Sequence, residues 1–329
     1  MPLERRLVPI NAFIGLCDPS PPWPLTLADA GFRLAALEVP VVTEAGTVTL
    51  DGVAHSRATG ELLVVECKSG ANIEEDQARR LATVQAASVV RSAAISLATP
   101  AAPQVEVIYL CLEEDTERIV MGLEKVHWPG AVLALSTTHL RMVRGPLTLP
   151  SLRDRFREPI PLRGPPPGFI TVDPESPDDA FDRLVRPALV ECQANRLPAI
   201  SVTSLTERAV PHLALYGKAA KGALQRKVSQ AARRIAAQAS DNYLYQPGSP
   251  NREPMVQILR TPEDADPRGR TQAYQALTRR GGASRRRPRP EAPGQAPLFE
   301  SLLNEPATDD EEVEEGGDGR GQGDAGGAL

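Results

Sequence analysis

Leu62 to Val65 form an unbroken apolar run that ends in Glu66, Cys67 and Lys68. Such a run between charged residues is typical of a strand that is buried on both faces of a sheet. Residues two apart on a strand point to the same side, so Glu66 and Lys68 share a face and Cys67 points to the other. Burying either charge without a partner is strongly unfavourable. We therefore expect this strand to end at an opening where both charges find partners.

A second acid lies on the preceding extended segment. Residues 39–50 are rich in β-branched side chains and predict a strand, and residues 56–60 contain the turn signal Ala-Thr-Gly. If the two strands pair antiparallel across that turn, Asp51 reaches the end of the strand that carries Glu66. A competing interpretation makes Asp51-Gly52 a tight hairpin turn, which would remove Asp51 from any such site.

Two converging carboxylates favour a divalent cation. Asp51, Glu66 and a main-chain carbonyl, for which Cys67 is the candidate, suit Mg²⁺ because this hard cation prefers oxygen ligands, and Mn²⁺ is the alternative metal. The adjacent Lys68 would orient or deprotonate an attacking water, or stabilise charge that builds on a phosphate. The simpler interpretation is a surface Glu–Lys pair that contributes little.

The pattern of Asp51, an apolar run, Glu66-Cys67-Lys68 and a following helix resembles the PD-(D/E)XK nuclease superfamily. The resemblance covers roughly residues 20–145. It implies a restriction-endonuclease-like core and a metal-dependent endonuclease that hydrolyses phosphodiester bonds in DNA, in phage defence, mobile-element processing or repair. It also implies that Gln77 supports the site. As a further acid of the site it makes Glu38 a candidate and Glu44 a weaker one.

The order of elements predicts an α/β fold with a mixed sheet flanked by helices. Spacing favours helices over residues 25–37 and 73–98, the latter capped by Ser69 or Asn72, and strands over 105–114 and 131–140. The predicted boundaries are a nuclease-like domain at 1–160, a Pro/Gly-rich linker at 161–177, a second domain at 178–262 and a disordered charged tail at 263–329.

The second domain is similar to a winged-helix DNA-binding domain. A helix from Asp178 with a bend at Pro187, a capping box at Ser204 and Glu207, a basic helix at 218–239 and a hairpin at 242–260 follow one another. Residues 204–239 carry seven Lys or Arg and one acid, which favours an anionic partner. The DNA contacts that this resemblance implies are Arg226, Lys227, Gln230, Arg233 and Arg234. A basic helix face that is only solvated is the plain alternative.

The tail contains one motif besides its charges. Gln295, Leu298 and Phe299 resemble the short peptide by which bacterial proteins dock on the DNA sliding clamp. Residues 283–329 hold five Arg and eleven acids, so the acidic run either solubilises the chain or mimics nucleic acid and shields the basic helix.

The remaining features exclude several classes of protein. No apolar run is long enough to span a membrane, and no secretory signal is evident, so we expect a cytoplasmic protein. Four scattered cysteines without a CxxC pair argue against a zinc knuckle and a disulfide framework, and Cys67 is expected to be a packed small side chain. His55 is a tempting general base, although a solvated loop position is the simpler expectation; His127, His139 and His212 are expected to be structural.

The alternatives from other classes are a non-catalytic DNA-binding protein or regulator with a degenerate nuclease-like domain, and an RNA nuclease. The sequence leaves open whether the protein forms a homodimer.

Overall fold

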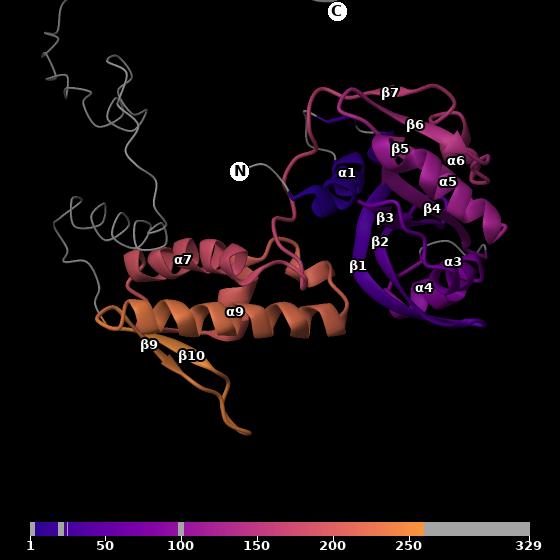
Figure 1. Ribbon diagram of the computed structural model, residues 1–329. Coiled ribbons are helices and arrows are strands. Elements are labelled where there is room, and N and C mark those ends of the chain that lie inside the picture. Colours follow the sequence, from indigo (N-terminus) through magenta and orange to yellow (C-terminus); the bar gives the residue numbers. More distant parts are fainter. Residues whose placement is uncertain (1–3, 19–22, 25, 98–101, 260–329) are drawn as a thin grey trace, which may run out of the picture. The chain divides into compact units, whose positions relative to one another are not determined.

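The computed structural model describes residues 4–18, 23–24, 26–97 and 102–259 (Figure 1). By its contacts the chain divides after Gly282, so every described residue lies in the first unit. The predicted tail and its motif of Gln295, Leu298 and Phe299 lie outside the described residues.

The first half of the chain builds a seven-stranded sheet with strands in sequence order, β1 to β7. Its strands are β1 (Phe32–Thr43), β2 (Gly46–Ser56), β3 (Glu61–Lys68), β4 (Gln104–Leu112), β5 (Val132–Leu135), β6 (His139–Arg144) and β7 (Ile160–Pro161). The pairs among β1, β2 and β3 are antiparallel, β3 to β5 are parallel, and β5 to β7 are antiparallel. The sheet is therefore mixed, as the sequence predicts.

Helices cover both faces of this sheet. The helical elements of this half are η1 (Arg5–Leu7), α1 (Val8–Cys17), α2 (Thr26–Asp29), α3 (Glu75–Ala82), α4 (Ala86–Ser92), η2 (Glu113–Asp115), α5 (Thr116–Lys125) and α6 (Pro150–Arg153). One apolar cluster joins α1 and α2 to one face through Phe13, Leu16 and Leu27, and another joins α3 and α5 to the opposite face through Leu81 and Leu123. The buried strand β3 lies between the two clusters, which explains its unbroken apolar run.

Four expected elements of this half are wrong. The single strand expected over 131–140 is two strands, β5 and β6, with residues 136–138 between them. Residues 25–37 do not form one helix, because the helix ends at Asp29, Gly31 has a φ of +85° and β1 begins at Phe32. The extended segment 39–50 spans two strands that are joined at residues 44–45. The helix expected over 73–98 is two helices, with Glu74 rather than Ser69 or Asn72 at the first cap.

The second half combines three helices with a small antiparallel sheet. Its elements are α7 (Asp178–Ala194), β8 (Ala199–Ser201), α8 (Val202–Ala209), η3 (Leu213–Leu215), α9 (Lys218–Gln238), β9 (Tyr243–Gln246) and β10 (Met255–Ile258). The strands are ordered β8-β10-β9, and α7 and α9 lie side by side (Figure 1). Helix α7 continues through Pro187, and the cap of α8 is Ser201, whose side chain accepts from the Ser204 amide, so the expected box at Ser204 and Glu207 is wrong.

The Pro/Gly-rich segment before α7 packs against the helix at the start of the chain. The Asn11 side chain is fully buried, its Nδ2 donates to the carbonyl of Ile170 at 2.8 Å, and its Oδ1 accepts from the Ile170 amide at 2.7 Å. Ile170 and Val172 belong to the same apolar cluster as α7 and α9. No helix in the described part of the chain is both long and apolar enough to cross a membrane.

Candidate active site

Asp51 lies inside β2 and reaches the end of β3. The antiparallel register pairs Gly52 with Val65, so Asp51 is next to Glu66 across the strands. Asp51 Oδ2 accepts a hydrogen bond from the Cys67 amide at 2.6 Å. The alternative hairpin turn at Asp51-Gly52 is wrong because both residues lie within the strand.

Glu66, Lys68 and Gln77 form a closed triangle of side chains. Glu66 Oε1 accepts from Lys68 Nζ at 2.9 Å and from Gln77 Nε2 at 2.8 Å. Gln77 Oε1 accepts from Lys68 Nζ at 2.9 Å. The structure therefore brings Glu66 and Lys68 to one face, and α3 supplies Gln77 beside them. The glutamate and the lysine are not a surface pair, since only 2 % of the Glu66 side chain is exposed.

The second carboxylate oxygen of Glu66 has no protein partner. Glu66 Oε2 is buried and makes no hydrogen bond among the described residues. Burial raises the pKa of Glu66, against the lowering effect of the Lys68 ammonium. Burial, then Glu66, raises the pKa of Asp51 well above its usual range. A buried carboxylate oxygen without a donor is unfavourable, and a cation or a proton would relieve it.

Asp51, Glu66 and Lys68 line one pocket of about 370 Å³. Residues from distant parts of the chain also line this pocket, so tertiary packing forms its wall. Its lining consists of Arg6, Leu7, Ile10, Leu37, Glu38, Asp51, Glu66, Cys67, Lys68, Ser69, Ile170, Asp173, Pro174, Glu175 and Tyr216. Sequence reasoning missed Arg6, Asp173 and Glu175, because no local pattern marks them. Arg6 Nη1 pairs with Asp173 Oδ2 at 2.6 Å at this wall.

Glu38 joins this pocket from β1. Leu37 pairs with Gly52 and Val39 with Leu50, so Glu38 lies opposite Asp51. Burial, then Asp173 and Glu66, raises the pKa of Glu38 to about 7. The weaker candidate, Glu44, is exposed and outside the pocket, and its Oε1 accepts from Gln85 Nε2 at 2.6 Å. Of the two further acids, only Glu38 is near the site.

The donor chemistry of the pocket suits a divalent cation. Among the described residues, no group of three or more His, Cys, Asp or Glu side chains is arranged to hold a metal. A cation would therefore rest on Asp51, Glu66 and a main-chain oxygen such as that of Cys67. The fit is supported by the unpartnered Glu66 Oε2 and by the raised pKa values of the acids, because a nearby positive charge would lower those pKa values.

Cys67 and His55 are not activated groups of this pocket. Burial, then Asp51 and Glu66, raises the pKa of the Cys67 thiol, which is the opposite of what a cysteine nucleophile needs. His55 lies in β2, only 6 % exposed, and does not line the pocket. The expected solvated loop position of His55 is therefore wrong.

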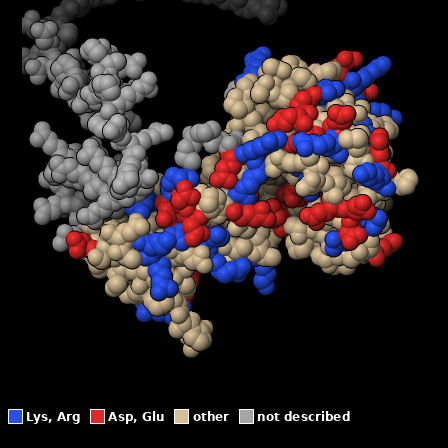
Figure 2. Space-filling view, in the orientation of Figure 1, with Lys and Arg blue, Asp and Glu red and all other residues tan. Residues whose placement is uncertain are grey.

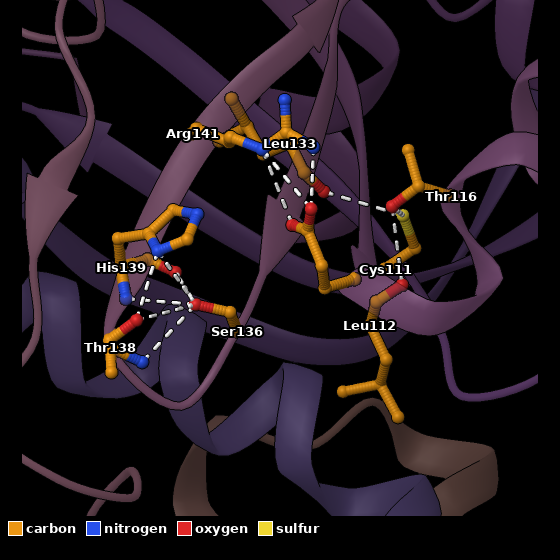
Figure 3. A network of polar contacts seen from close by, with 9 residues as sticks. Cys111, Leu112, Thr116, Leu133, Ser136, Thr138, His139 and Arg141 are labelled. Carbon is orange, nitrogen blue, oxygen red and sulfur yellow. Dashed lines mark hydrogen bonds and ion pairs between the residues drawn. The ribbon is translucent and has the colours of Figure 1, made fainter.

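Ser136 and His139 look like a nucleophile–base pair but close a turn (Figure 3). Ser136 Oγ lies 3.0 Å from His139 Nδ1, yet it also accepts from the amides of Thr138 and His139 at 3.2 and 2.9 Å. The hydroxyl thus holds the connection between β5 and β6. His127 and His212 have φ values of +54° and +58° next to helix ends, and neither lines the pocket, so their structural role stays a prediction.

The five predicted DNA contacts of α9 fall into two groups. Arg226, Gln230 and Arg233 are exposed, and none of them makes an ion pair or hydrogen bond that involves another described residue. Lys227 Nζ pairs with Asp178 Oδ1 at 3.0 Å, and Arg234 pairs with Asp178 and Asp182 on α7.

Lys227 and Arg234 are therefore ion-paired with acids of α7, and their contact with DNA stays a prediction. The spacing of Asp178 and Asp182 on the predicted helix is the signal that could have shown these ion pairs, because both acids face one side of the helix. Figure 2 accordingly shows acidic and basic side chains next to one another on the visible face, rather than one continuous basic surface.

Comparison with known proteins gives a match over part of the chain. The MJECL32 domain family model matches residues 7–124, which run from η1 to α5 and contain Glu38, Asp51, Glu66, Lys68 and Gln77. The match covers just over a third of the chain, and its description states no activity. No curated protein and no solved structure matches the chain.

Proposed function

We propose that the protein is a Mg²⁺-dependent endonuclease that hydrolyses phosphodiester bonds in DNA. The observation that carries the proposal is the buried Glu66, whose Oε1 is held by Lys68 and Gln77 while its Oε2 has no partner among the described residues, beside Asp51. The antiparallel β1–β2–β3 strands followed by parallel β4 support a restriction-endonuclease-like core.

In this proposal each side chain has a separate task. Asp51 and Glu66 hold the metal, which when bound supplies a Lewis acid and a water of lowered pKa. The Cys67 amide holds one oxygen of Asp51, which leaves the other oxygen for the metal at the pocket that Asp51 lines. Gln77 bridges Glu66 and Lys68 and orients both side chains.

Lys68 keeps its ammonium at the pocket, where 17 % of its side chain is exposed. A positive charge at this place stabilises the negative charge that develops on a phosphate, or positions the attacking water. The pair of Glu66 and Lys68 therefore supplies an anchor for a metal and a partner for the reacting group.

The second half supports binding of the DNA substrate. The order α7, β8, α8, α9, β9 and β10, with strands ordered β8-β10-β9, is compatible with a winged-helix-like domain. Arg226, Gln230 and Arg233 on the exposed face of α9 would meet phosphates and base edges. The proposal assigns no DNA contact to Lys227 or Arg234.

A plasmid assay tests the reaction. Supercoiled plasmid is incubated with Mg²⁺ and the wild type, Glu66→Ala, Lys68→Ala or the control Glu44→Gln, which changes an exposed acid outside the pocket. We expect nicking by the wild type and the control, loss in both site variants, and no reaction with a chelator. Parallel reactions with single-stranded RNA test the alternative of an RNA nuclease, which would cleave the RNA and leave the plasmid intact.

A non-catalytic DNA-binding protein is the alternative function. It is favoured by the lack of a three-ligand acidic or histidine group among the described residues. If the wild type and both site variants bind DNA but do not nick it, the result supports the DNA-binding protein and overturns the endonuclease proposal.

A further inference from the structure

A second cavity lies at the other end of the β1–β2 hairpin. Its volume is about 610 Å³, and it is lined by the first residues of β1, the last residues of β2 and the segment after α4. It shares no lining residue with the pocket at Glu66. A cavity of this size falls within the range that holds small molecules, about 300–1,000 Å³.

The charged side chains of this cavity are all basic. Arg33 and Arg57 line it, and no acid does so. Arg33 Nη1 donates to the carbonyls of Ala28 and Phe32, both at 2.8 Å, which fixes the guanidinium. Arg57 is exposed and makes no ion pair with another described residue. Two guanidinium groups without a carboxylate favour an anion, and their fork geometry suits a phosphate or a carboxylate.

His55 adds a buried polar atom to the same cavity. The residue lies directly opposite Arg33 across β1 and β2, is 94 % buried and lines the cavity. Its Nε2 is buried and has no hydrogen-bond partner among the described residues. Burial, then Arg57, lowers the pKa of the ring, and a neutral ring still donates from one nitrogen. An unpaired buried nitrogen is unfavourable, and a ligand oxygen would satisfy it.

The rest of the wall is apolar. Ile95 lines the cavity together with Ala35 and Ala93, and all three pack against the apolar cluster on that face of the sheet. A bare inorganic ion would leave this wall uncovered, whereas a molecule with a flat or apolar part would cover it.

We propose that this cavity binds a phosphate-bearing small molecule of nucleotide size, with its phosphate on Arg33, Arg57 and His55 and its remaining part against Ile95 and the neighbouring alanines. The site stands apart from the proposed endonuclease chemistry, because it uses none of the same residues. Binding at this site is therefore tested without measuring cleavage.

The probes are adenosine 5′-monophosphate, inorganic phosphate and adenosine, titrated separately into the full chain in a calorimeter. We expect the monophosphate to bind and adenosine not to bind. Arg57→Gln should weaken monophosphate binding about tenfold or more, which corresponds to about 1.4 kcal/mol. The matched control is Arg163→Gln, which removes an exposed arginine outside the cavity and should leave binding unchanged.

The comparison of probes identifies the source of the phosphate. Monophosphate binding much tighter than that of inorganic phosphate supports the proposal, whereas equal affinities overturn it, because the part beyond the phosphate would then contribute nothing. A shift of the His55 ring resonances on addition of monophosphate places the ligand in this cavity. The proposal is overturned if neither phosphate probe binds at millimolar concentration, if adenosine binds as tightly as the monophosphate, or if Arg57→Gln binds like the wild type.

Discussion

The Gly217 amide donates a hydrogen bond to the Leu37 carbonyl at 2.8 Å. Gly217 is the residue that caps α9, and Leu37 precedes Glu38 in the strand β1. Tyr216 and Leu37 also form an isolated parallel bridge. The start of the basic helix is thus attached to the strand that carries an acid of the candidate site.

Gly217 is required here for space rather than for its conformation. Its φ of −60° is open to any residue, but a Cβ at this position would lie well under 3.0 Å from the Glu38 carbonyl oxygen. We expect Gly217→Ala to lower the free energy of unfolding by about 1–3 kcal/mol, because the helix start has to move away from β1.

The matched control is Gly222→Ala in the same helix. There a Cβ would meet only Arg226 Nη1 at 3.7 Å. Alanine in a helix interior is more favourable than glycine by about 0.5–1 kcal/mol, so this variant should be as stable as the wild type or more stable. Urea unfolding of the three proteins measures both effects. Equal stability of Gly217→Ala and Gly222→Ala would contradict the close packing at Glu38.

The raised pKa of Glu38 predicts a loss of stability with rising pH. Its value is about 7 in the folded chain against 4.5 for an ordinary glutamate. Between these values the folded state holds more protons than the unfolded state, so the free energy of unfolding falls as pH rises and the loss is complete above about pH 7. In the wild type this group should lower the free energy of unfolding by up to about 3 kcal/mol between low and high pH, and Glu38→Gln should lack this loss.

Urea unfolding at about pH 5 and about pH 8 measures the difference. The raised pKa of Asp51 acts in the same direction, so some pH dependence should remain in Glu38→Gln. Glu44→Gln is the control, since Glu44 is exposed and outside the pocket, and it should keep the wild-type pH dependence. If Glu38→Gln lost as much stability with pH as the wild type, the half-buried placement of Glu38 beside Asp51 would be wrong.

Added Mg²⁺ should stabilise the wild type more at the higher pH, because the cation binds the deprotonated acids.

The strand β3 and its charged end could be predicted from sequence because both depend on local pattern. An apolar run has to be buried, and a period of two places Glu66 and Lys68 on one face. The same holds for α9, whose buried residues Leu224 and Val228 follow the helical period. Elements that repeat one strong period are specified locally.

The errors arise where two patterns compete or where the partner is distant in sequence. The leucines of residues 25–37 fit a helical spacing, but Gly31 with positive φ breaks the helix and the remainder pairs with β2. This pairing is what brings Glu38 opposite Asp51. The cap of α8 is Ser201 rather than Ser204 because the strand β8 ends there, paired with β10. Such outcomes depend on pairing that no short window of sequence contains.

The two groups of basic residues on α9 should respond differently to mutation. Arg226→Gln with Arg233→Gln should weaken DNA binding. The plot of log affinity against log salt should also become less steep by about 2, because two phosphate contacts are lost. Lys227→Gln with Arg234→Gln removes the pairs to Asp178 and Asp182, so it should mainly lower stability. Fluorescence anisotropy over a salt series and urea unfolding distinguish the two effects. A salt slope that changes only in the second variant would reverse the assignment of the helix faces.

Asn11 fixes the segment that carries the acidic wall of the pocket. Its side chain bonds both the amide and the carbonyl of Ile170, and Asp173 follows three residues later at the pocket. Asn11→Ala leaves both buried main-chain groups unpaired, which should lower the free energy of unfolding by about 2–4 kcal/mol. The Ile170 amide should also exchange its hydrogen faster than the overall loss of stability explains, because its acceptor is gone. Asn195→Ala, at an exposed asparagine, is the control and should change neither quantity. Hydrogen exchange at Ile170 that follows global unfolding alone would show that the segment is held without Asn11.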